Sequence, residues 1–225
     1  MTMPIHQITR FGLVNAYLVE EDDGLTLIDT TANPGAAKAI LAAAGKHGRP
    51  IVRIALTHAH QDHIGSLDAL AAALPGVEVL ISARDARLLA KDMTLEPGEE
   101  QGKLRGGYPG AATKPTRTIA AGDRVGSLEV HAARGHTPGQ LAFLDTRDRT
   151  LYCADTYSTV GGVATTAKRY WRFPLPASAT WHHPTALETA KAMRELGPAR
   201  LAPGHGKVVE SPGAAMHAAI ARGSA

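Results

Sequence analysis

Residues 57–70, THAHQDHIGSLDAL, place three histidines and one aspartate within six positions and then continue as an apolar helical pattern. Imidazole and carboxylate groups together suit zinc, manganese or iron, and the absence of thiolates argues against a cysteine-rich structural zinc site. His58 and His60 can point the same way from an extended turn, whereas Asp62 and His63 enter a helix and must point elsewhere. The spacing predicts that one short segment supplies ligands to two adjacent metals; the alternative is a solvated polar turn.

Other strand-like runs also end in a potential ligand. Asp29 follows LTLI, His136 follows EVHAARG, Asp155 ends TLYCAD and His205 follows ARLAPG. In a sheet covered by helices the strand ends converge, so we expect these side chains to meet at one edge. The predicted metal ligands are His58, His60, Asp62, His63, His136, Asp155 and His205. This set can hold two metals with open positions, and metals about 3.5–4 Å apart share a hydroxide whose pKa falls towards about 7, which is typical of a hydrolase.

The elements that must position these residues follow from periodicity and from glycine and proline signals. Strands are expected over 14–20, 25–30, 51–57, 77–82, 128–133, 140–146, 150–155 and 199–203. Helices are expected over 33–48, 64–74, 83–93, 184–196 and 212–221. Residues 94–117 read as a long loop, either a lid, a dimer contact or a poorly ordered excursion, and residues 158–181 form a second irregular region. Early strand–helix alternation and hairpins in the middle predict a mixed α/β sheet with helices outside.

Amino-acid composition and charge exclude several classes of function. Hydrophobic residues make up 44% and charged residues 20% of 225 residues, which fits one globular domain over 1–225. The net charge of +3 comes without a concentrated basic run, so no nucleic-acid partner is expected. A single cysteine, Cys153, excludes an internal disulfide framework and fits a reducing compartment. The first residues show neither a signal peptide nor a membrane anchor, so we expect a cytoplasmic protein with no membrane partner.

The segments THAHQDHIGS, GHTPGQ, CADT and PGHG resemble the successive motifs of the metallo-beta-lactamase fold superfamily, and Asp29 in LIDT matches its first motif. The resemblance runs from NAYLV to PGHG and implies a four-layer αββα sandwich with the metals at one sheet edge. It implies that Asp29 orients ligands by hydrogen bonds. Small residues such as Gly204 would let the backbone turn sharply beneath the metals.

The resemblance also assigns the ligands. His58, His60 and His136 would hold the first metal, whereas Asp62, His63 and His205 would hold the second, and Asp155 would bridge both. The implied cofactors are two divalent ions, zinc in the first place, with manganese or iron as alternatives. The implied partner is a small-molecule substrate, and the chain would act as a monomer or a homodimer.

Differences between this sequence and the known branches of the family narrow the range of reactions that we expect. Zinc beta-lactamases of this fold generally lack an aspartate at the bridging position, so Asp155 argues against penicillin hydrolysis, whereas lactonases and glyoxalase II-type thioesterases keep it. The glyoxalase II family carries a basic carboxy-terminal extension for glutathione, whereas Arg222 is the only lysine or arginine in the closing segment SPGAAMHAAIARGSA. This weakens a glutathione thioester as substrate. We therefore expect a hydrolase of a lactone or thioester in which a metal-bridging hydroxide attacks the carbonyl carbon. The alternatives are a mononuclear iron sulfur-oxygenase of the persulfide dioxygenase type, a beta-lactam hydrolase, or a non-enzymatic module with a vestigial site.

Three further groups are candidates for direct roles. Asp62 could shuttle a proton as well as bind metal. The Tyr157 hydroxyl, two residues beyond Asp155, could donate to a developing oxyanion, although it could equally be an ordinary loop tyrosine. Residues 168–170 lie where related hydrolases often contact substrate, with a solvated basic loop as the alternative.

Overall fold

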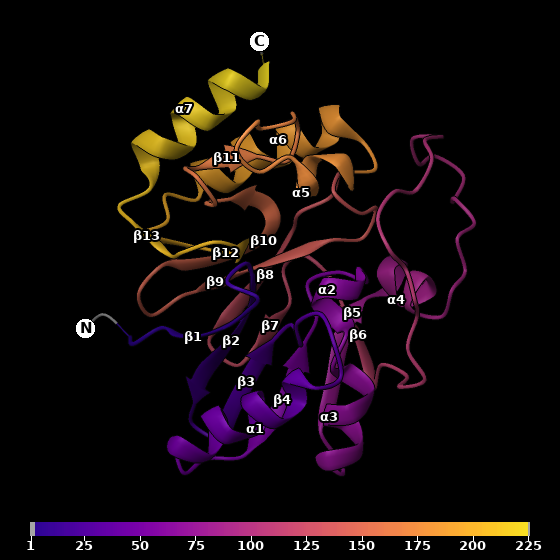
Figure 1. Cartoon of the computed structure of the whole chain (residues 1–225), viewed down its shortest axis with the longest axis vertical. Coiled ribbons are helices and arrows are strands. Elements are labelled where there is room, and N and C mark those ends of the chain that lie inside the picture. Colours follow the sequence, from indigo (N-terminus) through magenta and orange to yellow (C-terminus); the bar gives the residue numbers. More distant parts are fainter. Residues whose placement is uncertain (1–2, 225) are drawn as a thin grey trace.

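The computed structural model describes residues 3–224, in which thirteen strands form one curled, hydrogen-bonded sheet. The sheet bends into two facing halves that join between β2 (Val14–Glu21) and β12 (Arg200–His205), where His205 pairs with Val14 (Figure 1). Helices cover the outer face of each half, which gives the αββα order. None of the helices within residues 3–224 has the length and apolar character needed to span a bilayer.

The amino-terminal half supplies the parallel strands. Its order is β6 (Arg117–Ile119), β5 (Glu78–Ser82), β4 (Ile51–Ala55), β3 (Gly24–Ile28) and β2, with β1 (His6–Arg10) antiparallel to β2. The helices of this half are α1 (Ala36–Lys46), α2 (Gln61–Ile64), α3 (Leu67–Ala73) and α4 (Ala83–Leu89). Strands β3 to β6 are parallel, so the loops that follow them open at the same edge of the sheet.

The carboxy-terminal half is mainly antiparallel. Its order is β12, β10 (Thr150–Ser158), β9 (Leu141–Asp145), β8 (Leu128–Ala132) and β7 (Arg124–Val125), with β11 (Ala164–Thr165) beside β10 and β13 (Val209–Glu210) beside β12. Its helices are α5 (Leu175–Ser178), α6 (His183–Glu195) and α7 (Gly213–Ser224). The parallel pair β10–β12 brings the ends of both strands to the edge where the two halves meet.

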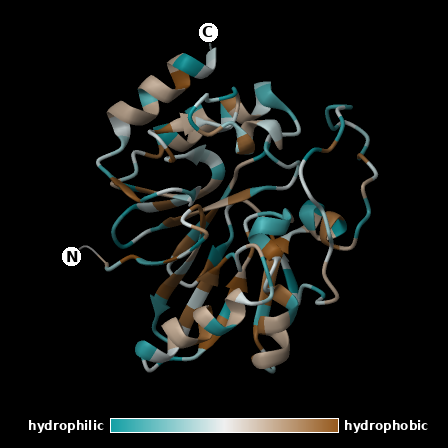
Figure 2. Cartoon of the chain, in the orientation of Figure 1, coloured by the Kyte–Doolittle hydropathy of each residue, from teal (hydrophilic) through white to brown (hydrophobic). Residues whose placement is uncertain are grey.

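Three apolar clusters fill the gaps between the four layers, and Figure 2 shows hydrophobic residues along the strands of the sheet. Alternation along β2 decides which cluster each residue joins. Leu18 belongs to the cluster that includes residues of α1, α3 and α4, whereas its neighbours Tyr17 and Val19 belong to the cluster between the two half-sheets. Residues of α6 and α7 pack against the outer face of the second half, among them Met193 and Met216.

The expected elements are present, with differences at their edges. Residues 94–116 form a loop without helix or strand, as predicted, and Arg117 begins β6. The second irregular region contains β11 and α5, and the helix expected over 64–74 is divided into α2 and α3. The short strands β6, β7, β11 and β13 were not predicted, because two or three residues are too few to show a period.

Candidate metal centre

The seven predicted ligands come together at the edge where the two half-sheets meet. Four follow β4, in the turn and in α2, and three belong to the second half, after β8, in β10 and at the end of β12. Their atoms fall into two groups of possible ligands, within each of which all atoms lie within 4.8 Å of one another. The first group is His58, His60 and His136, and the second is Asp62, His63, Asp155 and His205.

The first group is a set of three buried imidazoles. His60 Nδ1 lies 3.2 Å from His58 Nε2 and 3.0 Å from His136 Nε2. Zinc–nitrogen bonds of about 2.0–2.1 Å place two tetrahedral ligands about 3.3 Å apart, which is close to these spacings. The three rings therefore converge as ligands of one small cation would.

The outer nitrogen of each of these rings has an oxygen partner. His58 Nδ1 lies 2.9 Å from Thr57 Oγ1, and that hydroxyl donates onward to Asp29. His60 Nε2 lies 2.9 Å from the Arg105 carbonyl oxygen, which can only accept. His136 Nδ1 lies 3.0 Å from Thr180 Oγ1, which donates to the Pro176 carbonyl. Each ring thus carries its proton on the outer nitrogen, and each inner nitrogen presents a lone pair.

Burial fixes the charge of these three rings. Desolvation lowers the pKa of His58 and His60, and it lowers the pKa of His136 to about 3. All three are neutral at physiological pH. Neutral lone pairs about 3 Å apart repel one another unless a cation lies between them, so this donor set fits a divalent metal.

The second group combines two imidazoles with two carboxylates. His205 Nε2 lies 3.1 Å from Asp155 Oδ2 and 3.2 Å from Asp62 Oδ2. His63 Nε2 lies 3.4 Å from Asp155 Oδ1. The outer nitrogens again have acceptors, since His63 Nδ1 lies 2.7 Å from Asp29 Oδ2 and His205 Nδ1 lies 3.2 Å from the Leu13 carbonyl. His63 Nε2 and Asp155 Oδ1 are buried and make no hydrogen bond within residues 3–224. Both atoms are therefore available as ligands for a metal ion.

Charge coupling holds this group together. Burial opposes ionisation of Asp62 and Asp155, but the neighbouring imidazoles dominate and hold the pKa of both carboxyls below the usual range. In the same way, burial opposes protonation of His63 and His205, but the carboxylates raise the pKa of His63 and bring that of His205 to about 10. The carboxylates therefore stay ionised, and a positive charge beside them stabilises them. That charge can be a proton on an imidazole or a metal ion.

Asp155 lies between the two groups. Its Oδ2 is 3.3 Å from His136 Nε2 of the first group, while its Oδ1 faces His63 of the second. Gly204 makes room for it, because a Cβ built there would overlap Asp155 Oδ1 and lie 2.7 Å from His63 Cε1. The carboxylate is thus positioned to serve both groups, and the glycine beneath it cannot take a side chain.

A pocket of about 300 Å³ opens onto both groups. Apolar residues form much of its wall, among them Leu13, Phe173, Leu175 and Pro176. The loop over residues 94–116 forms the opposite rim, with Gly106 and Gly107. The long loop is therefore part of the site, and the Tyr108 ring lies 4.6 Å from the His60 ring, centroid to centroid.

The catalytic role suggested for Tyr157 is wrong. Its side chain is fully buried in the cluster beneath α6, and its hydroxyl donates to the Ala190 carbonyl at 2.6 Å. The register of β10 shifts on both sides of Ala154, the residue before Asp155, so Tyr157 does not share the orientation of Asp155 that two-residue alternation suggests. Cys153 packs in the same cluster.

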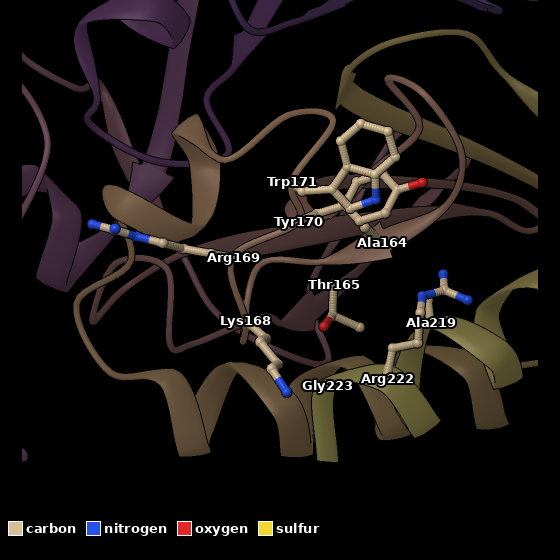
Figure 3. A pocket seen from close by; sticks show the side chains of 9 residues that line it. All are labelled: Ala164, Thr165, Lys168, Arg169, Tyr170, Trp171, Ala219, Arg222 and Gly223. Carbon is tan, nitrogen blue, oxygen red and sulfur yellow. The ribbon is translucent and has the colours of Figure 1, made fainter. Parts of the chain in front are cut away.

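The basic segment at residues 168–170 also lies outside the metal pocket. Lys168, Arg169 and Tyr170 line a separate pocket between β11 and α7, and none of its lining residues belongs to the metal pocket. Figure 3 shows the Arg169 side chain extending away from the other side chains that line this pocket, while Arg222 reaches towards them from α7. The substrate contact considered for these residues finds no support in this geometry.

Apart from Asp29, sequence reasoning did not identify the residues that hold the ligands in place. Asp85 is fully buried and accepts hydrogen bonds from Ala59 N, Thr137 Oγ1 and Gly139 N, each at 2.9 Å. It ties the turn that carries His58 and His60 to the loop that carries His136. The only available signal was its place in a short helix directly after a buried strand.

Comparisons with known proteins agree with this geometry. The family model described as "Metallo-beta-lactamase superfamily" matches residues 9–205. Uncharacterized protein YobT of Bacillus subtilis (strain 168) is 44% identical over 220 residues, covering 96% of this chain and 94% of YobT. A hydroxyacylglutathione hydrolase of Rhodospirillum rubrum is 32% identical over 166 residues, covering 71% of this chain and 54% of that protein, so this chain spans about half of its length.

Solved structures show the same fold. BLEG-1 B3 metallo-beta-lactamase superposes with a TM-score of 0.69 at 21% identity, covering 93% of this chain and 95% of that one. TTHA1623 in a di-iron-bound form superposes with a TM-score of 0.68 at 25% identity, covering 94% of this chain and 96% of that one. The match of the family model over most of the chain, together with the αββα fold, shows that the chain belongs to the metallo-beta-lactamase superfamily.

Proposed function

We propose that this protein is a dinuclear metal-dependent hydrolase that cleaves a small-molecule ester-like bond, either a lactone or a thioester. One observation carries the proposal. All five imidazoles at the sheet edge direct their outer nitrogens to oxygen atoms and their inner nitrogens towards one another and towards Asp62 and Asp155. Such a donor set fits two divalent ions better than it fits water or protons alone.

The two groups of side chains correspond to two metal ions. We assign His58, His60 and His136 to one ion, and Asp62, His63 and His205 to the other, with Asp155 serving both. When bound, such a pair of ions activates a water molecule at neutral pH and polarises a carbonyl oxygen. Zinc is the expected metal, and the di-iron form of TTHA1623 makes iron the first alternative.

Asp62 is the side chain placed to move a proton. Its side chain is 36% exposed and lines the pocket, and its Oδ2 faces His205 Nε2. Its Oδ1 makes no hydrogen bond within residues 3–224, so this atom can accept a proton from the attacking water and pass it to the leaving oxygen or sulfur. His205 keeps the carboxylate ionised and oriented for that transfer.

The pocket supports an uncharged acyl group as the part of the substrate nearest the metals. Leu13, Phe173 and Leu175 offer apolar contact, and no lysine or arginine is among the residues that line this pocket. The hydroxyacylglutathione hydrolases among the relatives act, by their names, on a thioester of glutathione, which supports a thioester bond. The pocket lining itself contains no lysine or arginine that could bind a negatively charged part of the substrate.

The test is metal analysis of the purified protein followed by a panel of lactones, thioesters, phosphodiesters and beta-lactams. About two metal ions per chain and hydrolysis of a lactone or thioester are expected. His58→Ala should lower both, whereas the exposed His217→Ala should change neither. Full activity after complete chelation would refute the proposal. Oxygen uptake with one iron per chain would instead favour a sulfur-oxygenase, and turnover of beta-lactams alone would favour a lactamase.

A further inference from the structure

We propose that His6, Glu20 and His47 form a second metal site, for one divalent ion of the zinc class. The site lies away from the metal centre described above. Glu20 is six residues from Val14 along β2, and Val14 pairs with His205 at the metal centre, so the two sites are about 20 Å apart at 3.3 Å per residue. The proposal does not depend on what the protein hydrolyses.

Strand register brings two of these residues to one face. His6 in β1 pairs with Leu18 in β2, so both side chains lie on the same face of the sheet, and Glu20 lies on that face two residues further along. Leu18 belongs to the same apolar cluster as Ile40 and Ala44 of α1, and α1 contacts β1, so α1 covers this face. His47 caps the carboxy-terminal end of α1 and there meets the other two side chains.

The geometry is that of three ligands around one small ion. His6 Nε2 and His47 Nδ1 each lie 3.2 Å from the same oxygen, Glu20 Oε1, and the two ring centroids are 4.0 Å apart. Tetrahedral zinc ligands lie about 3.3 Å apart. An imidazolium–carboxylate hydrogen bond would be shorter, at about 2.7–2.9 Å.

Charge also favours a cation at this place. Within residues 3–224 neither lysine nor arginine forms an ion pair with the Glu20 carboxylate, whose only such partners are the two imidazoles. Arg147 lies nearby but donates to the Glu20 backbone carbonyl instead. The three side chains are only 18–33% exposed, so water compensates the carboxylate incompletely. A divalent ion would neutralise it and keep a fourth position for water.

The expected consequence is structural. One ion held by β1, β2 and the end of α1 would fasten the amino-terminal strand to the helix that covers it. Binding to the folded chain alone raises its stability by mass action, so zinc should protect this region without affecting turnover.

The experiment counts metal ions in matched proteins. Wild type, His6→Ala/His47→Ala, Glu20→Gln and the control His217→Ala are stripped with a chelator, reloaded at a buffered low micromolar level of free zinc, desalted and analysed for metal. Wild type and control should hold one more ion per chain than the double variant. Glu20→Gln, which keeps the side-chain size, should weaken binding of that ion about tenfold or more.

A second background separates this site from the metal centre. In His58→Ala/His63→Ala, added zinc should still raise the midpoint of thermal unfolding, and adding the His6→Ala/His47→Ala changes should abolish that rise. Equal zinc content in wild type, Glu20→Gln and the double variant would overturn the proposal. Loss of metal only at the sheet edge would affect the proposed hydrolase and leave this site intact.

Discussion

Asp29 determines which nitrogen of His63 carries the proton. It directly follows β3 and has a left-handed backbone (φ 58°), a conformation that aspartate and asparagine tolerate better than most residues. Its Oδ1 accepts from Thr57 N, and its Oδ2 faces both Thr57 Oγ1 and His63 Nδ1. A carboxylate can accept all three bonds, because it has no hydrogen of its own to place among them.

Asp29→Asn should therefore weaken metal binding while it preserves the fold. The amide oxygen can still accept from Thr57 N, but the NH₂ group then faces His63 Nδ1 and forces the ring proton onto Nε2, the atom directed into the site. We expect a loss of metal affinity of about 10- to 100-fold. Zinc titration of the variant and of Asp22→Asn, an exposed aspartate, measures it. Unchanged affinity in Asp29→Asn would show that the carboxylate does not set the tautomer.

At this scale the sequence reveals the ligands and one residue that supports them, Asp29, but not the other supports. The seven ligands carry side-chain chemistry in a spaced motif or at a strand end, and Asp29 is found by the same reasoning. The support of His60 is a backbone carbonyl, at Arg105, which any residue type could supply. The support of His136 is Thr180, 44 residues away, so only the folded chain relates them.

Among the elements, the loop over residues 94–116 is held against the metal centre at one point. His60 Nε2 donates to the Arg105 carbonyl, and Gln61 N donates to the Gly107 carbonyl at 2.9 Å. Gly106 lies between these contacts with φ +89°, and a Cβ built there would overlap His60 Nε2. The close approach of loop and ligand therefore requires glycine.

Gly106→Ala should displace the loop and loosen His60. We expect weaker metal binding and a raised KM, because the loop also forms one rim of the pocket. Gly98→Ala is the matched control, since Gly98 belongs to the same loop and has φ +87° but nothing within 4 Å of its added Cβ. Backbone strain of about 1 kcal/mol is common to both variants, so only the contact with His60 separates them. Equal metal affinities in the two variants would contradict this reasoning.

Asp85 connects α4 to both ligand-bearing loops and has an unusual proton equilibrium. Burial raises the pKa of its carboxyl to about 6, and the hydrogen bonds from Thr137, Ala59 and Gly139 only partly oppose that shift. In the unfolded chain the value is about 3.9. Between these two values the folded chain keeps a proton that the unfolded chain has released, so the contribution of Asp85 to the free energy of unfolding falls as the pH rises.

Asp85→Asn should remove the part of the pH dependence of the free energy of unfolding that comes from this carboxyl. Urea unfolding at pH 4, 5, 6 and 7, with chelator present, gives the free energy of unfolding of both proteins. The wild-type value minus the variant value should decrease as the pH rises from about 4 to about 6, by at most roughly 3 kcal/mol. Subtraction cancels the other titrating groups. A difference that stays constant or increases with pH would show that the buried carboxyl is not protonated in this way.

The long elements were predictable because each carries many periods of its pattern, and the second half of β10 was not. Its register shifts on both sides of Ala154, the residue before Asp155, and Ala154 has a left-handed backbone (φ 48°). Alternation then no longer predicts which way a residue points, which is why Tyr157 reads as a site residue in the sequence but packs beneath α6. Such irregularities depend on the partner strand, and the sequence of β10 alone does not contain them.

For the molecule as a whole, the metal centre lies across the junction between two half-sheets. Four ligands belong to the first half and three to the second, while the pairing of β2 with β12 is a single residue pair, His205 with Val14. Side chains add to this junction, since Asn15 and Tyr17 both donate to the Pro203 carbonyl. Bound metal would thus hold together two layers that have few backbone hydrogen bonds between them.

Metal removal should therefore destabilise the whole chain and not only the site. At metal concentrations of about 100 times Kd, each site adds about 2.7 kcal/mol, and each kcal/mol raises the midpoint of unfolding of a chain of this size by about 2–4 °C. In the His6→Ala/His47→Ala protein, where only the edge centre responds, chelation should lower the midpoint by about 5–10 °C for each ion lost. Zinc should restore it, and adding His58→Ala/His63→Ala should make the midpoint insensitive to chelator. If chelation removes the metal but leaves the midpoint of thermal unfolding unchanged, this prediction is wrong. Backbone and apolar contacts alone would then hold the two half-sheets together, and metal binding would add nothing to the stability of the fold.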